Sequence, residues 1–116
     1  LHFLSFFLVS NDNPDYIIGT ISLSHINRGS SPSANMGYKI DRLNRGKGLA
    51  SLMIAHMLDV VIPDLGIHRT ECYIHPDNKI SLHLMDKLSF IDEGIAHSYV
   101  KLNGKWQDHR RFVYIS

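Results

Sequence analysis

The sequence has 116 residues, 44% of them hydrophobic, which suits one domain with a buried core and excludes a multi-domain chain. Twelve Lys and Arg against eleven Asp and Glu give a net charge of +1, which excludes a bulk basic field for nucleic acid or an anionic membrane, so any phosphate recognition must be local. Cys72 is the single cysteine, which excludes an internal disulfide and agrees with a cytoplasmic location.

The chain opens on the apolar run LHFLSFFLVS, which predicts a buried strand over residues 2–9. The run is too short to span a bilayer, and it lacks the basic start and the small-residue cleavage site of a signal peptide. A domain that opens directly on such a strand is expected to be cut short at its amino terminus.

Strands precede helices along the chain, and Asn, Asp, Gly and Pro mark the turns between them. The predicted elements in order are strands over 2–9, 16–24 and 35–40, a helix that begins near Leu49 and is ended by Pro63 and Gly66, a strand over 69–75, a helix capped by Asp77 or Asn78 that runs to Leu88, and strands over 90–100 and 106–115 joined by an Asn103-Gly104 hairpin turn. Because a long helix joins the third and fourth strands, these two strands are expected to run parallel. The order predicts a single α/β domain over residues 1–116 with a mixed sheet.

The spacing of apolar residues predicts which faces of these elements are buried. The first helix is expected to pack on the sheet through Leu49, Leu52, Met53, Met57, Val60 and Val61, and the second through Ile80, Leu84 and Leu88. Alternation in the strand over 69–75 puts Thr70, Cys72 and Ile74 on one face and Glu71 and Tyr73 on the other.

The stretch from Gly37 to Leu58 carries the main functional signal. A short strand runs into a turn that contains Gly46 and Gly48, and a helix follows directly. Unpaired N–H groups at a helix start point outward and the helix dipole adds partial positive charge, so this turn is suited to binding phosphate groups through its backbone. If the parallel strands diverge, an extended ligand can also hydrogen-bond to a strand edge.

The same residues permit simpler interpretations. Glycines in a tight turn before a helix need no ligand. A dinucleotide-binding fingerprint would place Glu71 on the ribose, but Ser51 stands at its third glycine position and antiparallel strands surround the unit. By default, Asn78 is a helix cap and Ser81 a solvated helix serine.

The motif Arg45-x-x-Gly48-x-Ala50 stands between a predicted strand and a predicted helix. It resembles the Arg/Gln-x-x-Gly-x-Gly/Ala motif of the GNAT acetyltransferases, and its setting is the one that this family has. Four later motifs are similar to the RimJ/RimL branch: His68-Arg69, Pro76-x-Asn78-x-x-Ser81, Lys87-Leu88-x-Phe90-x-x-Glu93-Gly94 and Asn103-Gly104-x-Trp106-x-Asp108. The resemblance covers the chain from Tyr16 to its end, with Ser89 where the family usually has glycine.

The resemblance implies a GNAT fold, with a mostly antiparallel sheet, a parallel pair flanking the main helix, and a strand and two helices that the family places ahead of Leu1. It also implies acetyl-coenzyme A as the acetyl donor. Its pyrophosphate would bind the backbone N–H groups of Arg45, Gly46, Lys47, Gly48, Leu49 and Ala50. The pantetheine arm would pair with the edge of the third strand near Met36 to Arg42, with Ile40 at the position where the family makes a backbone contact.

The resemblance also implies roles in the transfer to an amine. Asn78 is similar to the family residue that binds the arm or an ordered water, and Ser81 to the residue that gives a proton or hydrogen bond to the departing thiolate. Some members use a glutamate on the fifth strand as the base, but Val100 stands there and Glu93 is the substitute. Loss of the amine proton through water is an equal alternative, because α-amino groups titrate near pH 8.

Two classes of function therefore stay open. The first is an enzyme that acetylates a primary amine, either a protein α-amino group or a small molecule. The second is a coenzyme A-binding regulatory module without turnover. No histidine pair falls at i, i+4 on a predicted helix, so no metal site is expected, and a homodimer is expected through exposed sheet edges.

Overall fold

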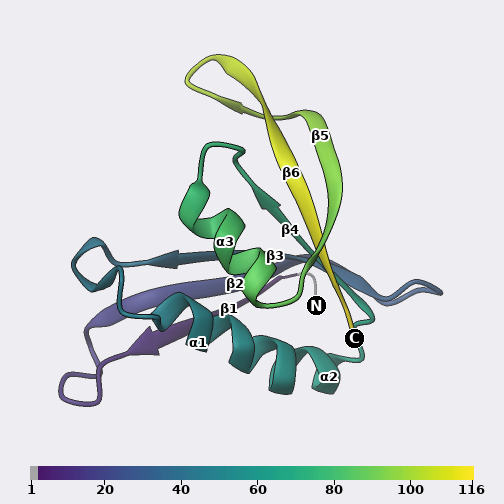
Figure 1. Ribbon diagram of the computed structural model, residues 1–116. Helices are drawn as coiled ribbons and strands as arrows, with labels where there is room; N and C mark the ends of the chain where they lie inside the picture. Colours follow the sequence, from purple (N-terminus) through teal and green to yellow (C-terminus); the bar gives the residue numbers. More distant parts are fainter. Residues whose placement is uncertain (1–2) are drawn as a thin grey trace.

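Residues 3–116, which the computed structural model describes, form one six-stranded sheet with helices packed on one face (Figure 1). His2, at the start of the first predicted strand, lies outside this range. The elements in chain order are β1 (Phe3–Val9), β2 (Ile17–Asn27), β3 (Ser33–Ile40), a 3-10 turn (Arg42–Asn44), α1 (Leu49–His56), a π-helical turn (Met57–Val61), α2 (Ile62–Leu65), β4 (Arg69–Ile74), α3 (Lys79–Lys87), β5 (Ile91–Leu102) and β6 (Lys105–Ile115).

The strand order in the described sheet is β1-β2-β3-β4-β6-β5. The prediction of a mixed sheet is confirmed, because β3 and β4 pair in parallel while the other neighbours pair antiparallel. The helical segment of α1 and α2 connects the parallel strands β3 and β4, as expected for the right-handed crossover of a βαβ unit. The hairpin turn at Asn103 and Gly104 is also confirmed, with φ of 52° and 75° at the two residues.

The buried stripe of α1 is rotated from the predicted one. Leu52 is 61% exposed and Val60 is 45% exposed, so the prediction that both pack on the sheet is wrong. In the helical segment from α1 to α2, the buried side chains are instead those of Met53, Ile54, Met57, Leu58 and Ile62. The same correction applies to Ile80 on α3, which is 84% exposed while Ser81, Leu84 and Met85 point inward.

The helix does not end at Pro63, contrary to the prediction. A π-helical turn over Met57–Val61 precedes it, and the N–H of Ile62 bonds to Met57 five residues back. Pro63 then lies in the first turn of α2, where its missing N–H is tolerated. Gly66 ends the helix as expected, with a left-handed φ of 68°.

The rotated stripe predicts a large difference between two neighbouring truncations. Ile54 has no exposed area, so Ile54→Ala is expected to lower the free energy of unfolding by about 2–5 kcal/mol through lost burial and a cavity. Leu52→Ala removes an exposed side chain and is expected to change it by less than about 0.5 kcal/mol. Urea denaturation of both variants measures the two free energies of unfolding. Equal losses in the two variants would contradict the burial of Ile54 in place of Leu52.

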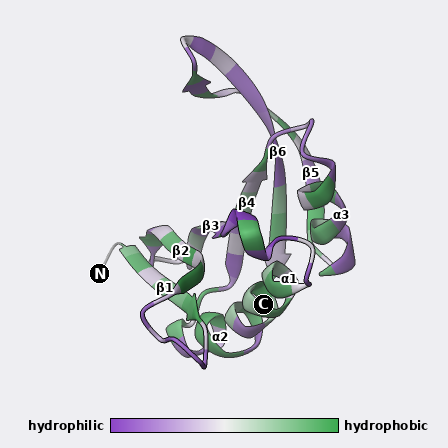
Figure 2. Cartoon of the chain, turned by 90° about the vertical axis from the view of Figure 1, so that its left-hand side faces the viewer, coloured by the Kyte–Doolittle hydropathy of each residue, from purple (hydrophilic) through white to green (hydrophobic). Residues whose placement is uncertain are grey.

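Two features of the sheet shape the site. β3 and β4 pair only from Ser33 to Asn35 with Arg69 to Glu71 within the described strands, and beyond that point they diverge. The β5–β6 hairpin extends away from the rest of the molecule (Figure 2). The later halves of β3 and β4 are therefore not hydrogen-bonded to each other, and we call this unpaired region the β3–β4 gap.

Candidate active site

The bend from Asn44 to Ala50 places two left-handed glycines directly before α1. Gly46 has φ of 79° and Gly48 has φ of 74°, a region that glycine enters without steric cost. Both glycines are exposed, and a Cβ built on either one meets no atom within 4 Å. The backbone of the bend is therefore open to a ligand.

Backbone donors in this bend lack partners in the described chain. The first hydrogen bond of α1 runs from the N–H of Leu52 to the carbonyl of Gly48, at 3.2 Å. Across residues 3–116, no backbone acceptor is recorded for the N–H groups of residues 46–51. These N–H groups lie at the positive end of the helix dipole, so together they form a donor set for an anion.

Basic side chains surround the bend. Arg45 donates from Nε to the carbonyl of Ile40 at 3.4 Å, and Lys47 donates from Nζ to Asn44 Oδ1 at 3.4 Å. Both side chains are exposed, so these long contacts yield readily to a stronger anion. The neighbouring Asp41 accepts from the Tyr16 hydroxyl at 2.6 Å, which lowers the pKa of that carboxyl.

Asn78 and Ser81 lie where β4 leads into α3. The Asn78 side chain accepts from the N–H of Ser81 at 3.2 Å, so it is a helix cap, as its default interpretation predicted. Ser81 is 9% exposed and therefore not a solvated helix serine. Its Oγ accepts from the Tyr38 hydroxyl at 2.8 Å, so this hydrogen bond joins β3 to α3.

Side-chain alternation places these groups on the helix-covered face of the sheet. Met36 and Ile40 are buried on β3, and Tyr38 lies between them on the same face. The Ile40 side chain is 9% exposed and its carbonyl accepts from Arg45 Nε, so the predicted contact of its backbone with the pantetheine arm stays a prediction. The later half of β3 has an edge that is not paired with β4, and an extended molecule paired with that edge would run from the bend toward Ser81.

Glu93, the predicted substitute base, does not lie beside Ser81. It forms ion pairs with Arg69 and, at 3.2 Å, with Arg111, on the face of β4 and β6 opposite the helices. The hydrogen bond from Arg69 lowers the pKa of the Glu93 carboxyl, which makes it a weaker base. The structure does not bring Glu93 together with Ser81, and Glu71 is bound to Arg69 and Tyr73 instead of being free for a ribose.

That opposite face carries aromatic side chains that the sequence did not single out for function. The rings of Tyr73 and Tyr99 stack with centroids 4.1 Å apart and an interplanar angle of 9°. His109 lies 5.4 Å from Tyr99, and its Nδ1 is buried without a partner in the described chain. The alternation of β4, which separates Tyr73 from Cys72, was the signal that pointed to this face.

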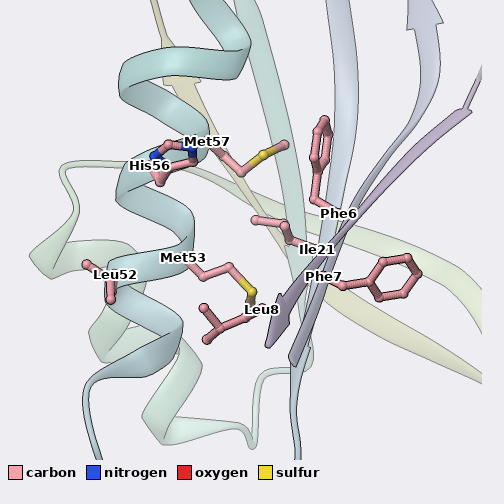
Figure 3. A pocket seen from close by; sticks show the side chains of 8 residues that line it. All are labelled: Phe6, Phe7, Leu8, Ile21, Leu52, Met53, His56 and Met57. Carbon is pink, nitrogen blue, oxygen red and sulfur yellow. The ribbon is translucent and has the colours of Figure 1, made fainter. Parts of the chain in front are cut away.

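A separate cavity of about 420 Å³ lies between β1 and α1 (Figure 3). Apart from His56, its lining is apolar: Phe6, Phe7, Leu8, Ile21, Leu52, Met53 and Met57. In the close view Leu8 and Met53 point toward one another, whereas the Leu52 side chain points away from the sheet. Such a lining cannot replace the hydration of a diphosphate, so this cavity is not the anion site.

Other candidate chemistries find little support in the structure. Cys72 is 2% exposed, and burial raises the pKa of its thiol to about 12, so it is a core residue as predicted. Within residues 3–116, no group of three or more His, Cys, Asp or Glu side chains is arranged to hold a metal ion. No helix in the same range is long and apolar enough to cross a bilayer.

Comparisons with known proteins agree with this geometry. The family model described as "Acetyltransferase (GNAT) domain" matches residues 2–91. The chain is 38% identical over 96 residues to the probable N-acetyltransferase YjcK of Bacillus subtilis (strain 168), which covers 83% of this chain and 53% of YjcK.

Solved structures give the same answer. The ribosomal-protein-S5-alanine acetyltransferase of Vibrio fischeri superimposes with a TM-score of 0.90 at 31% identity, over 96% of this chain and 60% of that one. Mycobacterium smegmatis RimJ in complex with CoA-disulfide has a TM-score of 0.90 at 25% identity, over 99% and 54%. The chain therefore spans between 53% and 60% of the length of these relatives. Sheet order, family model and relatives show that the chain belongs to the GNAT acetyltransferases, with RimJ-like proteins among its relatives.

Proposed function

We propose that this chain transfers an acetyl group from acetyl-coenzyme A to a primary amine. The observation that carries the proposal is the set of unpartnered N–H groups at residues 46–51, at the start of α1, which packs on the same core as the helix that carries Ser81. The RimJ relative in complex with CoA-disulfide supports coenzyme A as the molecule that fits this face. A protein α-amino group is the first acceptor to test, because one relative is an S5-alanine acetyltransferase.

The donor would lie extended across the site. Its pyrophosphate would accept from the N–H groups of Gly46 to Ala50, with Arg45 and Lys47 adding positive charge. Its pantetheine arm would take backbone hydrogen bonds from β3 near Ile40, as an added strand does. The amide nitrogen of Asn78, whose oxygen caps α3, is available to the arm.

The acceptor would approach from the other face, since α1, α3 and Tyr38 occupy the helix side. The amine nitrogen attacks the thioester carbonyl carbon, a C–N bond forms, and the C–S bond breaks. A strand N–H group would stabilise the oxygen of the tetrahedral intermediate. Ser81 would give its hydroxyl proton or a hydrogen bond to the departing thiolate sulfur.

The amine proton would leave through water. An α-amino group titrates near pH 8, so a usable fraction is already neutral at physiological pH. Holding that amine beside the thioester supplies much of the rate by itself. This role for water replaces Glu93, whose carboxylate is held by Arg69.

Glu93→Gln is therefore expected to leave kcat within about twofold of the wild-type value between pH 6 and 9. The folded pKa of Glu93 is lowered, so its ion pair contributes stability above the unfolded pKa and loses it as the pH falls through the folded pKa. The variant should thus differ from wild type in thermal unfolding, with the difference shrinking in acid. A fall in kcat of about 100-fold with a shifted pH profile would make Glu93 the base after all.

Thiol release distinguishes the proposal from a coenzyme A-binding module without turnover. The chain is mixed with acetyl-coenzyme A and, in separate samples, an alanine-initiated peptide, spermidine or no acceptor, and free thiol is measured. Release that depends on an acceptor supports the enzyme. Stabilisation by coenzyme A without release under any condition would favour the module.

A homodimer and a cytoplasmic location remain predictions. Within the described sheet β1 is an edge strand, and its Phe3 and Phe7 are each 58% exposed. An exposed apolar edge is suited to pairing with a second chain. Light scattering of the purified chain measures the oligomeric state directly.

A further inference from the structure

The sequence and the resemblance assigned no role to the Tyr38 side chain, yet it contacts Ser81 directly. Its hydroxyl donates to Ser81 Oγ at 2.8 Å. This hydrogen bond joins β3 to α3 through two residues that are 43 positions apart in the sequence. Tyr38 lies in the part of β3 that no longer pairs with β4, and its side chain reaches α3 on the helix-covered face, beside the unpaired strand edge where the thioester would lie.

The hydrogen bonds around Ser81 define what its hydroxyl is able to do. The backbone N–H of Ser81 is used by the Asn78 cap, and one Oγ lone pair is used by Tyr38. No acceptor within residues 3–116 is recorded for the hydroxyl hydrogen of Ser81. That hydrogen is therefore available to a group placed in the gap.

Accepting a hydrogen bond also changes the chemistry of the serine oxygen. Donation from Tyr38 withdraws electron density from Oγ and makes the Ser81 hydroxyl a better donor, since adjacent hydrogen bonds polarise each other. Burial raises the pKa of Tyr38, so its hydroxyl keeps its proton and goes on donating through the neutral range.

We propose that Tyr38 is a positioning residue that fixes the Ser81 hydroxyl with its hydrogen directed at the sulfur of the departing coenzyme. This inference rests on the proposed function and adds the group that orients its proton donor. When the C–S bond breaks, the proton passes from Ser81 Oγ to sulfur. Water then reprotonates the serine oxygen and takes up the proton that the amine releases, while Tyr38 keeps its own proton. No reactant other than water is needed.

A double-variant cycle tests the inference on the described chain, with an alanine-initiated peptide as acceptor. Tyr38→Phe removes the hydroxyl and keeps the ring, and it is expected to lower kcat about tenfold while leaving KM for acetyl-coenzyme A within about twofold. Tyr38→Phe combined with Ser81→Ala should be no slower than Ser81→Ala alone, because Tyr38 acts through Ser81.

Tyr114→Phe is the matched control. Tyr114 is a partly buried tyrosine on β6 that packs against Phe90, with centroids 5.6 Å apart, and it is expected to leave kcat unchanged. Calorimetry with coenzyme A should give the same affinity for wild type and Tyr38→Phe, which shows that the donor site is intact.

The outcomes separate the two claims. An active wild type with an equally active Tyr38→Phe overturns the inference and leaves the proposed function standing. A double variant slower than Ser81→Ala by the full Tyr38→Phe factor also overturns it, because the effects are then independent. A wild type that releases no thiol with any acceptor contradicts the proposed function, and the inference falls with it.

Discussion

Gly48→Val is expected to weaken coenzyme A binding by about 100-fold or more, which corresponds to about 2.7 kcal/mol. The branched side chain would cover the N–H groups that face the pyrophosphate, because Gly48 is the last residue before α1 and is fully open to solvent in the chain alone. Isothermal titration calorimetry with coenzyme A measures the effect. An affinity equal to that of wild type would contradict the assignment of the bend.

Gly66→Val is the matched control for this variant. Gly66 has φ of 68°, close to the 74° of Gly48, and a Cβ on either residue meets no atom within 4 Å. Both variants therefore carry a similar backbone strain of about 1–2 kcal/mol, but Gly66 lies at the far end of the helix, after α2. Equal loss of affinity in both would trace the effect to stability and not to the ligand.

Ser81→Ala is expected to lower kcat about 100-fold while coenzyme A affinity stays within about twofold of wild type. The expected fall in kcat is large because the thiolate then leaves without a group that protonates it. The affinity is expected to stay because Ser81 is not among the residues proposed to bind the pyrophosphate. Initial rates of thiol release at saturating acetyl-coenzyme A and calorimetry with coenzyme A give the two quantities.

Ser10→Ala controls for loss of a hydroxyl as such. Ser10 lies in the turn between β1 and β2, where its Oγ accepts from the N–H of Asp12 at 3.2 Å, and it has no part in the proposed site. Its kcat is expected to match wild type. A Ser81→Ala enzyme as fast as this control would reduce Ser81 to a structural residue of α3.

The topology was predictable because local signals specify it. The two glycines at 46 and 48 adopt left-handed φ values, Asn78 caps α3, and Asn103-Gly104 forms the hairpin turn, each as its residue type favours. Ser89 stands where the family usually has glycine, and its φ is 65°, so this position keeps the left-handed backbone that glycine favours. Turn and cap chemistry depend on few neighbours and so survive in the sequence.

The phase of the helices was not predictable in the same way. Leu52 and Ile54 are both aliphatic and two residues apart, so either one fits a helical stripe. Which of them is buried depends on how α1 sits against β2 and β3, and a π-helical turn shifts the later residues. Tertiary packing, and not local periodicity, decided the face.

The candidate site, too, has parts that the sequence predicts and parts that it does not. The bend and the Asn78–Ser81 spacing are local and were found, whereas the contact of Tyr38 with Ser81 and the ion pair of Glu93 with Arg69 join distant segments. The glutamate was identified by its residue type and its place in a motif. Its arginine partners lie on other strands, and they change what its carboxylate is able to do.

A crystal structure of the chain with acetyl-coenzyme A tests the central claim most directly. The account predicts pyrophosphate oxygens within about 3.2 Å of backbone nitrogens among residues 46–51, and the thioester in the β3–β4 gap beside Ser81. A nucleotide lodged in the apolar cavity between β1 and α1, with the bend closed by its own side chains, would contradict it.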